Sequence, residues 1–178
     1  MKRNSERVVF VVTGVSALCA SVFFIAGCPP TVITGPPDGG EPTGEQLFKL
    51  VTETDPFENW ASFPGQDGIL DSAAPHGPKV RVHINDTVEA VLAGVTGQLP
   101  DGSIIVKENL EESTSDKAMA LTIMWKVSGF DPDNNDWFWA KITPAGVVDA
   151  EGKLEGCIGC HGQQRANDFI FRHNFTGN

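Results

Sequence analysis

Two cysteines and a histidine near the C-terminus form the most chemically specific pattern of this chain, Cys157-Ile-Gly-Cys160-His161. A Cys-x-x-Cys-His run is the attachment motif of c-type haem. One turn of chain places the two thiols beside the two vinyl groups of a porphyrin, and the adjacent histidine then lies under the iron as its proximal ligand. The motif therefore predicts one covalent haem c, bound through Cys157 and Cys160, with His161 as the metal ligand.

Two other uses of these cysteines are weaker interpretations. A zinc site would need a further ligand from His76, His83, His173 or a carboxylate, and none of these stands at a recognisable spacing. A thioredoxin-like dithiol would need a strand before the motif, which Glu155-Gly156 does not indicate. Both alternatives stay open, but export to an oxidising compartment, where haem is attached to such motifs, favours haem.

The first 27 residues have the layout of a bacterial export signal. Three basic residues lie within positions 1–7, and an apolar run follows from residue 8 to residue 27. The run is long enough to span a bilayer as a retained helix. However, Ile25-Ala26-Gly27-Cys28 resembles the lipobox of bacterial lipoproteins, in which the cysteine is acylated and becomes the new N-terminus. We therefore predict a signal peptide over 1–27, a lipid on Cys28, and attachment to a membrane of the bacterial cell envelope, facing the periplasm or the outside.

Composition divides the remaining chain into a tether and one domain. Residues 28–44 contain five prolines and four glycines, which predicts a semi-extended tether that cannot build a core. Residues 45–178 are then a single haem domain. The chain carries 23 acidic and 13 basic residues and a formal charge of -10, so we expect no binding to nucleic acid.

The pattern of the domain predicts an α+β fold, a mainly antiparallel β-sheet with a few short helices and one covalently attached haem. Strict alternation over 79–85 indicates a half-buried strand, with His83 on its polar face. Further strands are expected over 103–108, 118–127 and 136–142, with a common face for Met119, Leu121, Ile123 and Trp125. Helix starts are expected at Thr43, as a capping box with Gln46, and at Asp86, and turns at 144–146 and 151–152.

The position of the haem motif excludes the two common folds of c-type electron carriers. The usual helical type has the motif near the N-terminus and a methionine ligand well downstream, whereas only 17 residues follow His161 here and none is Met. The helical-bundle type conflicts with the predicted strands. Met119 and Met124 lie on opposite faces of one strand, so at most one could approach a haem. His173 is a further candidate for a sixth ligand, near a terminus where order is rare.

Over roughly residues 56–172 the chain resembles the cytochrome P-460 and cytochrome c-prime-beta family. The resemblance rests on the order of these segments: Asn59-Trp60, Ala74-Pro75-His76-Gly77, 80–85, 101–108, Trp137-Phe138-Trp139, the haem motif and Asn167-Asp168-Phe169. It implies a sheet domain, usually a homodimer, whose five-coordinate haem leaves an open distal side for a small nitrogenous or diatomic ligand.

The two branches of this family differ in one lysine. In the P-460 branch a strand lysine is bonded to a haem meso carbon, and the matching position here is Lys107, which would be a catalytic and cofactor-binding residue. The resemblance implies hydroxylamine oxidation for that branch, with electrons passing to a periplasmic cytochrome. The c-prime-beta branch lacks the cross-link and binds nitric oxide without turnover. From the residues alone, Lys107 is a charged residue at the end of a strand.

Three functions therefore remain open: hydroxylamine oxidation, nitric oxide binding, and electron transfer with a six-coordinate haem. Oxidation requires a distal base, yet the strand over 118–127 contains no Asp or Glu. Either Asp116 or Asp131 supplies the base, or the distal pocket is apolar, which would favour ligand binding over turnover. His76 is expected in a turn. The tryptophans 125, 137 and 139 would either line the haem or form ordinary core.

Overall fold

The structure is a computed structural model that describes residues 34–92, 94, 97–111 and 117–175. The predicted signal peptide, the lipidation site Cys28, the first part of the tether and the candidate base Asp116 lie outside these residues. Within the described ranges, no helix is long and apolar enough to cross a membrane.

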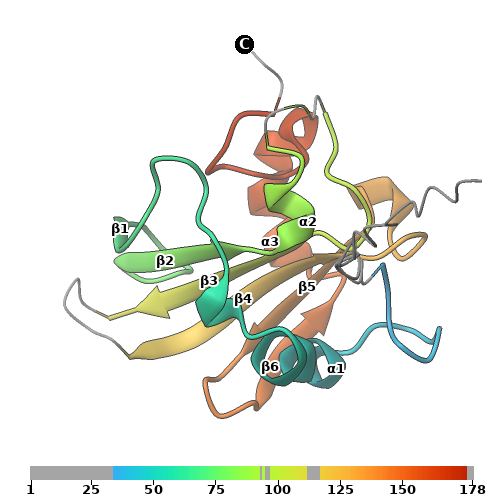
Figure 1. Ribbon diagram of the computed structural model, residues 1–178, viewed down its shortest axis with the longest axis horizontal. Helices are drawn as coiled ribbons and strands as arrows, with labels where there is room; N and C mark the ends of the chain where they lie inside the picture. The colour runs from blue at the N-terminus through green and yellow to red at the C-terminus, as the bar shows by residue number, and fades with distance from the viewer. Residues whose placement is uncertain (1–33, 93, 95–96, 112–116, 176–178) are drawn as a thin grey trace, which may run out of the picture.

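Six strands form one antiparallel sheet in which each strand pairs with the next along the chain (Figure 1). The strands are β1 (Leu70–Asp71), β2 (Lys79–Ile84), β3 (Ile104–Leu110), β4 (Ala118–Lys126), β5 (Trp137–Ile142) and β6 (Val148–Gly152). This order needs only hairpin connections, which suit antiparallel pairing. The α+β prediction is confirmed.

Short helices lie on both sides of the sheet. In Figure 1, α1 lies on one side, and α2 and α3 lie on the other. The helices are α1 (Gly44–Lys49), η1 (Leu50–Thr54), η2 (Phe57–Asn59), α2 (Asp86–Glu89), η3 (Pro132–Asn134), α3 (Glu155–His161) and η4 (Gly162–Asn167). The π-helix η1 continues α1 without a break, and the 3-10 helix η4 follows α3 directly.

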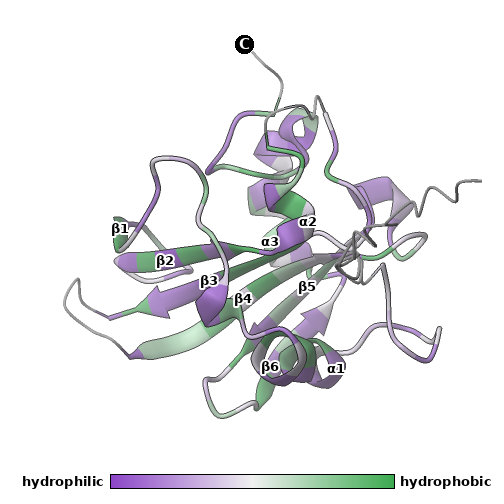
Figure 2. Ribbon diagram, viewed as in Figure 1, coloured by the Kyte–Doolittle hydropathy of each residue, from purple (hydrophilic) through white to green (hydrophobic). Residues whose placement is uncertain are grey.

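Alternation along the strands gives the sheet two apolar faces. One face, which includes Ile123 and Trp125, packs against Leu47 of α1 and Val51 of η1. The other lies beneath α2 and α3, where Val88 of α2 joins a core cluster with the strand residues Val80, Val82, Ile105, Met124, Trp137 and Trp139. Figure 2 shows hydrophobic segments running along the central strands, with hydrophilic segments in the connecting loops. The second face is the one that carries the functional site.

One of the two predicted helix caps is confirmed, and the other lies at a different residue. The Thr43–Gln46 capping box is confirmed, with both reciprocal hydrogen bonds present. The cap of α2 is Asn85 instead of Asp86, because Asn85 Oδ1 accepts from Val88 N at 3.3 Å. The same side chain also accepts from Ile104 N at 3.0 Å, so Asn85 ties the helix start to β3. Asp86 lies in the first turn, where a negative charge favours the helix dipole.

Three expectations about the strands were wrong. Residues 151–152 were expected to form a turn, but they end strand β6. Backbone hydrogen bonding to β5 does not require apolar and polar side chains to alternate, so the residue pattern did not indicate this strand. His83 is buried on its face instead of solvated, because its ring bonds Glu108 at 2.9 Å and packs against Phe57. Met119 is half exposed and does not pack with Leu121, Ile123 and Trp125, because the register between β3 and β4 shifts at this residue.

Candidate haem-binding site

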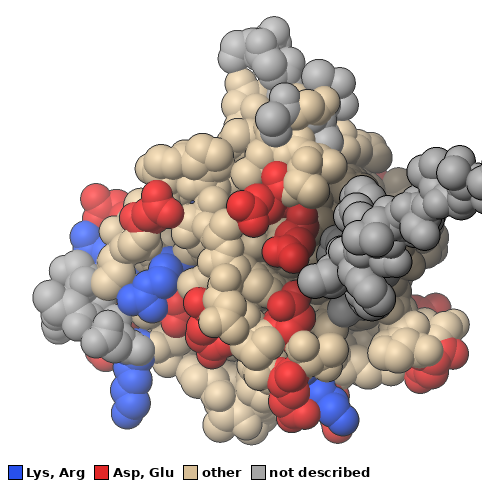
Figure 3. All heavy atoms as spheres, viewed as in Figure 1, with Lys and Arg blue, Asp and Glu red and all other residues tan. Residues whose placement is uncertain are grey.

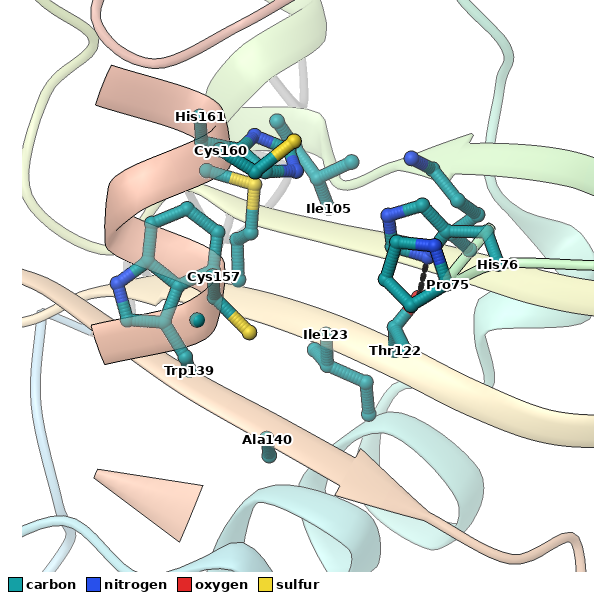
Figure 4. A pocket seen from close by; sticks show the side chains of 13 residues that line it. Pro75, His76, Ile105, Thr122, Ile123, Trp139, Ala140, Cys157, Cys160 and His161 are labelled. Carbon is teal, nitrogen blue, oxygen red and sulfur yellow. Dashed lines mark hydrogen bonds between the residues drawn. The ribbon is translucent and has the colours of Figure 1, made fainter. Parts of the chain in front are cut away.

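Helix α3 carries the whole Cys-x-x-Cys-His motif on one side of a pocket between the helix and the sheet. Cys157 and Cys160 are free thiols three residues apart, about one helical turn, and both line this pocket (Figure 4). Burial raises the pKa of the Cys157 thiol, with a further contribution from Cys160. The thiols and His161 are thus brought together as the motif predicts, by a helix that the sequence analysis did not foresee.

The buried ring of His161 is oriented by one backbone carbonyl. Its Nδ1 lies 2.8 Å from Phe169 O, and because a carbonyl can only accept, Nδ1 carries the proton. Burial lowers the pKa of His161, so the ring is neutral at pH 7. The Nε2 lone pair is therefore left for a metal, with the outer nitrogen fixed in the way typical of metal-binding histidines.

A buried ion pair holds the segment that supplies this carbonyl. Asp168 and Phe169 both have left-handed backbone conformations, with φ of 52° and 65°. The carboxylate of Asp168 is fully buried and accepts two bonds from Lys126 Nζ, at 2.8 and 2.9 Å. It also accepts from Leu99 N and from Asn135 Nδ2. This pair fixes the turn after η4, and so the position of the proximal histidine.

Sequence reasoning assigned no role to Lys126 or Asp168. In the sequence, Lys126 is the only ionisable residue of the strand over 118–127, and Asp168 belongs to one of the segments that carry the family resemblance. The signal that could have indicated this ion pair is a lysine within an otherwise apolar strand, because a buried lysine needs an ionic partner. The partner lies 42 residues away, and no local pattern identifies it.

The expected alternative ligand His173 is held away from His161. Asn167 Nδ2 donates to Ile170 O and His173 O, and its Oδ1 accepts from Phe175 N, all at 2.6 Å. The His173 ring consequently stacks on Phe63, with centroids 5.6 Å apart. His173 lines a separate hollow beside η4.

The pocket is mainly apolar. In the described part of the chain its lining consists of Pro75, His76, Ile105, Lys107, Thr122, Ile123, Met124, Trp139, Ala140, Gly156, Cys157, Cys160 and His161. A second hollow adjoins it through shared residues and adds Phe63, Val82, Phe169, Ile170, Phe171 and Arg172. Of the two strand methionines, Met124 reaches the site. Of the tryptophans, Trp139 lines the pocket, and its ring centroid is 4.9 Å from that of His161. Trp125 and Trp137 are core residues.

Lys107 projects from β3 into both hollows, between Val82 and Thr122 in the sheet register. Burial, with a smaller contribution from Arg172, lowers the pKa of its amine to about 8, although the two cysteines act in the opposite direction. About a tenth of the amine is therefore uncharged at pH 7. A lysine that looked like an ordinary strand-end residue is instead a half-buried amine beside the haem motif.

No carboxylate lines either hollow among the described residues. Asp131, one of the two expected bases, is buried elsewhere, where it accepts from Asn134 Nδ2 at 2.8 Å and lies 3.6 Å from Lys153 Nζ. The other, Asp116, is outside the described residues. The expectation that Asp131 supplies a distal base is therefore wrong.

His76 is the titratable residue that the sequence placed only in a turn. It lines the pocket on the side opposite α3, and its Nδ1 lies 3.1 Å from Thr122 Oγ1 (Figure 4). Burial, Lys107 and His161 together lower its pKa to about 4, so the ring is neutral at pH 7. No local signal could have identified this role, because His76 and His161 are far apart in the sequence.

Comparison with known families identifies this arrangement. The family model described as Cytochrome P460 matches residues 72–172, which include every lining residue of the main pocket. The chain belongs to the cytochrome P460 family. No curated protein matches the chain. Membership of the cytochrome P460 family makes it a haem protein that binds iron.

The residues of the site fit the haem of the cytochrome P460 family. Two free thiols lie one turn apart, a neutral imidazole presents Nε2, and apolar side chains from β3, β4 and β5 form the opposite wall. Trp139 Nε1 is also buried beside the motif without a hydrogen-bond partner among the described residues. Cys157, Cys160 and His161 would hold the haem.

Proposed function

We propose that this protein is a mono-haem c-type cytochrome that oxidises hydroxylamine and passes the electrons to a periplasmic cytochrome. The observation that carries the proposal is the position of Lys107, in one pocket with Cys157, Cys160 and His161. In the P-460 branch of the family that the sequence resembles, a lysine at this place is bonded to the haem. Family membership alone does not distinguish the branches, so the proposal rests on this side chain.

The environment of Lys107 supports a bond to the haem edge. Forming this bond replaces the meso C–H and one amine N–H by C–N, so two protons and two electrons must leave, the electrons to a two-electron oxidant such as a peroxide. The amine can take part only in its unprotonated form, and a pKa of about 8 supplies that form near neutral pH. Val82 and Thr122 flank the side chain in the sheet and limit its directions, so the amine is held toward the hollow that contains the cysteines. A lysine on a solvated strand end would keep a fully charged amine.

The remaining residues of the site would position ligand and haem. The bound haem supplies a Lewis-acidic iron that can accept electrons. Phe169 O orients His161, and the apolar side chains of Ile105, Met124 and Trp139 exclude water from the ligand side. His76, neutral at pH 7, is the proton acceptor that this pocket offers in place of a carboxylate.

Nitric oxide binding without turnover is the second candidate. The observation in its favour is that no carboxylate lines the hollows among the described residues. An apolar pocket holds a neutral diatomic molecule readily but gives no strong base for removing several protons from hydroxylamine.

The substitution Lys107→Leu separates the two candidates. If the lysine is bonded to haem, the wild-type dithionite-reduced protein has a broad, strongly red-shifted Soret band, and Lys107→Leu restores an ordinary c-type band and abolishes hydroxylamine oxidation. Lys141→Leu is the matched control, because Lys141 is half exposed on β5 and pairs with Asp149. An ordinary ferrous spectrum in the wild type, with nitric oxide bound and no turnover, would establish the second candidate instead.

We also propose that a lipid on Cys28 anchors the domain at the outward face of a bacterial membrane, with residues 28–44 as the tether. The charge of the domain suits an aqueous compartment. Figure 3 shows acidic side chains across the middle of the visible face, with basic ones toward its edge. A cytochrome partner with a basic surface would complement this face. Mass spectrometry of the mature N-terminus tests the lipid directly.

A further inference from the structure

A second cation lies beside the haem motif, on the side of His161 away from the cysteines. Figure 4 shows the two thiols and His161 together in the main pocket. Arg172 does not line that pocket, but it lines the second hollow, which contains neither cysteine. His161 and Lys107 line both spaces. Arg172 and the thiols are therefore separated by the proximal histidine.

The half-buried guanidinium of Arg172 has no anionic partner among the described residues. Its Nη2 donates to the backbone carbonyl of Asp71 at 2.6 Å, and it makes no other hydrogen bond or ion pair in the described part of the chain. The carboxylate of Asp71 is 91% exposed and pairs with Lys79 instead. Because a guanidinium has five N–H donors, most of those of Arg172 are left for another group.

The second hollow carries positive charge that nothing in the described chain neutralises. Lys107 and Arg172 are the cationic residues of its lining, and no carboxylate lines it among the described residues. The two cations are close enough for Arg172 to lower the pKa of Lys107, after the larger effect of burial. Like charges in a poorly solvated place oppose each other, so an anion in this hollow would be stabilised.

Haem supplies anions of the right kind for this place. A porphyrin of this type has its vinyl groups on one edge and its two propionates on the opposite edge. Thiols that bond the vinyls, with a histidine under the iron, therefore direct the propionates past the histidine. In this structure that direction leads from the main pocket to the hollow of Arg172. A guanidinium also matches a carboxylate in shape, with two parallel N–H···O bonds.

We propose that Arg172 binds one haem propionate and that this ion pair raises the midpoint potential of the iron. The inference rests on the haem attachment proposed above, but it requires neither hydroxylamine turnover nor the lysine bond. Arg172 also donates to Asp71 O of β1, so the ion pair ties the edge of the haem to the sheet. The amine of Lys107 stays available for the meso carbon.

The test is the resonance Raman spectrum and the midpoint potential of the haem-loaded protein. In Arg172→Gln the propionate bending band should shift, because the carboxylate loses its guanidinium. The midpoint potential should fall, because removal of a positive charge beside the haem favours ferric iron. We expect about a tenfold change in the equilibrium, which is about 59 mV for a one-electron couple. Arg172→Lys should retain most of the potential and still shift the band, since an ammonium cannot form two parallel bonds.

Lys79→Gln is the matched control. It removes one positive charge and the cation that pairs with Asp71 on the same strand β1, but Lys79 lines neither space. Its Raman band and its potential should equal those of the wild type. An unchanged propionate band in Arg172→Gln, or a shift of the same size in Lys79→Gln, would overturn the proposal.

Arg172→Lys keeps the proposal testable if Arg172→Gln folds poorly, because it preserves the charge and a donor for Asp71 O. An unchanged propionate band in this variant would likewise overturn the proposal. Failure of the haem attachment would be seen separately, as protein without covalent haem under denaturing conditions. Failure of the lysine bond would be seen as an ordinary Soret band in the wild type, whatever the Raman result.

Discussion

Replacing Lys126 by methionine is expected to lower the free energy of unfolding by about 3–5 kcal/mol, the usual cost of removing one partner of a buried ion pair. Lys126 is 4% exposed and Asp168 is fully buried, so the substitution leaves a carboxylate without its cation in the protein interior. Methionine preserves most of the length and the apolar stem, which separates the loss of charge from the loss of packing. Urea denaturation of the haem-loaded protein measures the effect.

Two controls define the meaning of this result. Lys141→Met removes the cation of the Lys141–Asp149 pair in the same sheet, where both side chains are largely exposed, and should cost about 0–1 kcal/mol. Adding Asp168→Asn to Lys126→Met removes the unpaired charge and should recover part of the lost stability. Equal costs for Lys126→Met and Lys141→Met would show that the buried pair does not stabilise the turn that supplies Phe169 O.

Removing both thiols, as Cys157→Ala with Cys160→Ala, is expected to abolish covalent haem attachment completely, because the proposed bond to Lys107 would form only on haem that the thioethers already hold. The two thioethers would form from cysteines one helical turn apart, so each single variant should retain one bond and the double variant none. Haem that remains with the protein in denaturing gel electrophoresis, together with the intact mass, gives the readout.

Gly159→Ala is the matched control within the same motif, because a methyl group at this position meets no atom within 4 Å. It should retain a full complement of haem, since the Cys-x-x-Cys-His spacing is unchanged. Covalent haem in the double cysteine variant that disappears when Lys107→Leu is added would contradict attachment through the thiols alone. It would show that the lysine bond forms independently of them.

Much of the local structure follows directly from the sequence. The capping box at Thr43 and the buried face of β2 depend on residues within a few positions of one another, and both were predicted correctly. The deviations arise from contacts with residues outside the local segment. Asn85 displaced Asp86 as the cap because it also bonds β3, and Glu151 joined β6 because backbone pairing at a sheet edge does not require an alternating pattern.

By itself, the sequence predicted the type of cofactor and the side chains that would bind it. Cys157, Cys160 and His161 lie within five residues, so their relative positions follow from one helical turn. The order of segments along the chain likewise indicated the family, which the family match over residues 72–172 confirms. The sequence also indicated Lys107 as the residue that distinguishes the P-460 branch from the c-prime-beta branch of the family.

Only the tertiary structure decided what surrounds that motif. The register of β3 and β4 places Lys107 and Thr122 side by side, and the loop before β2 brings His76 opposite His161. The turn after η4 brings Asp168 to Lys126. These contacts join residues that are distant in the sequence, and they arise because the two apolar faces of the sheet must be covered by particular helices and loops. Side-chain type fixes what chemistry is available, whereas packing fixes which groups meet.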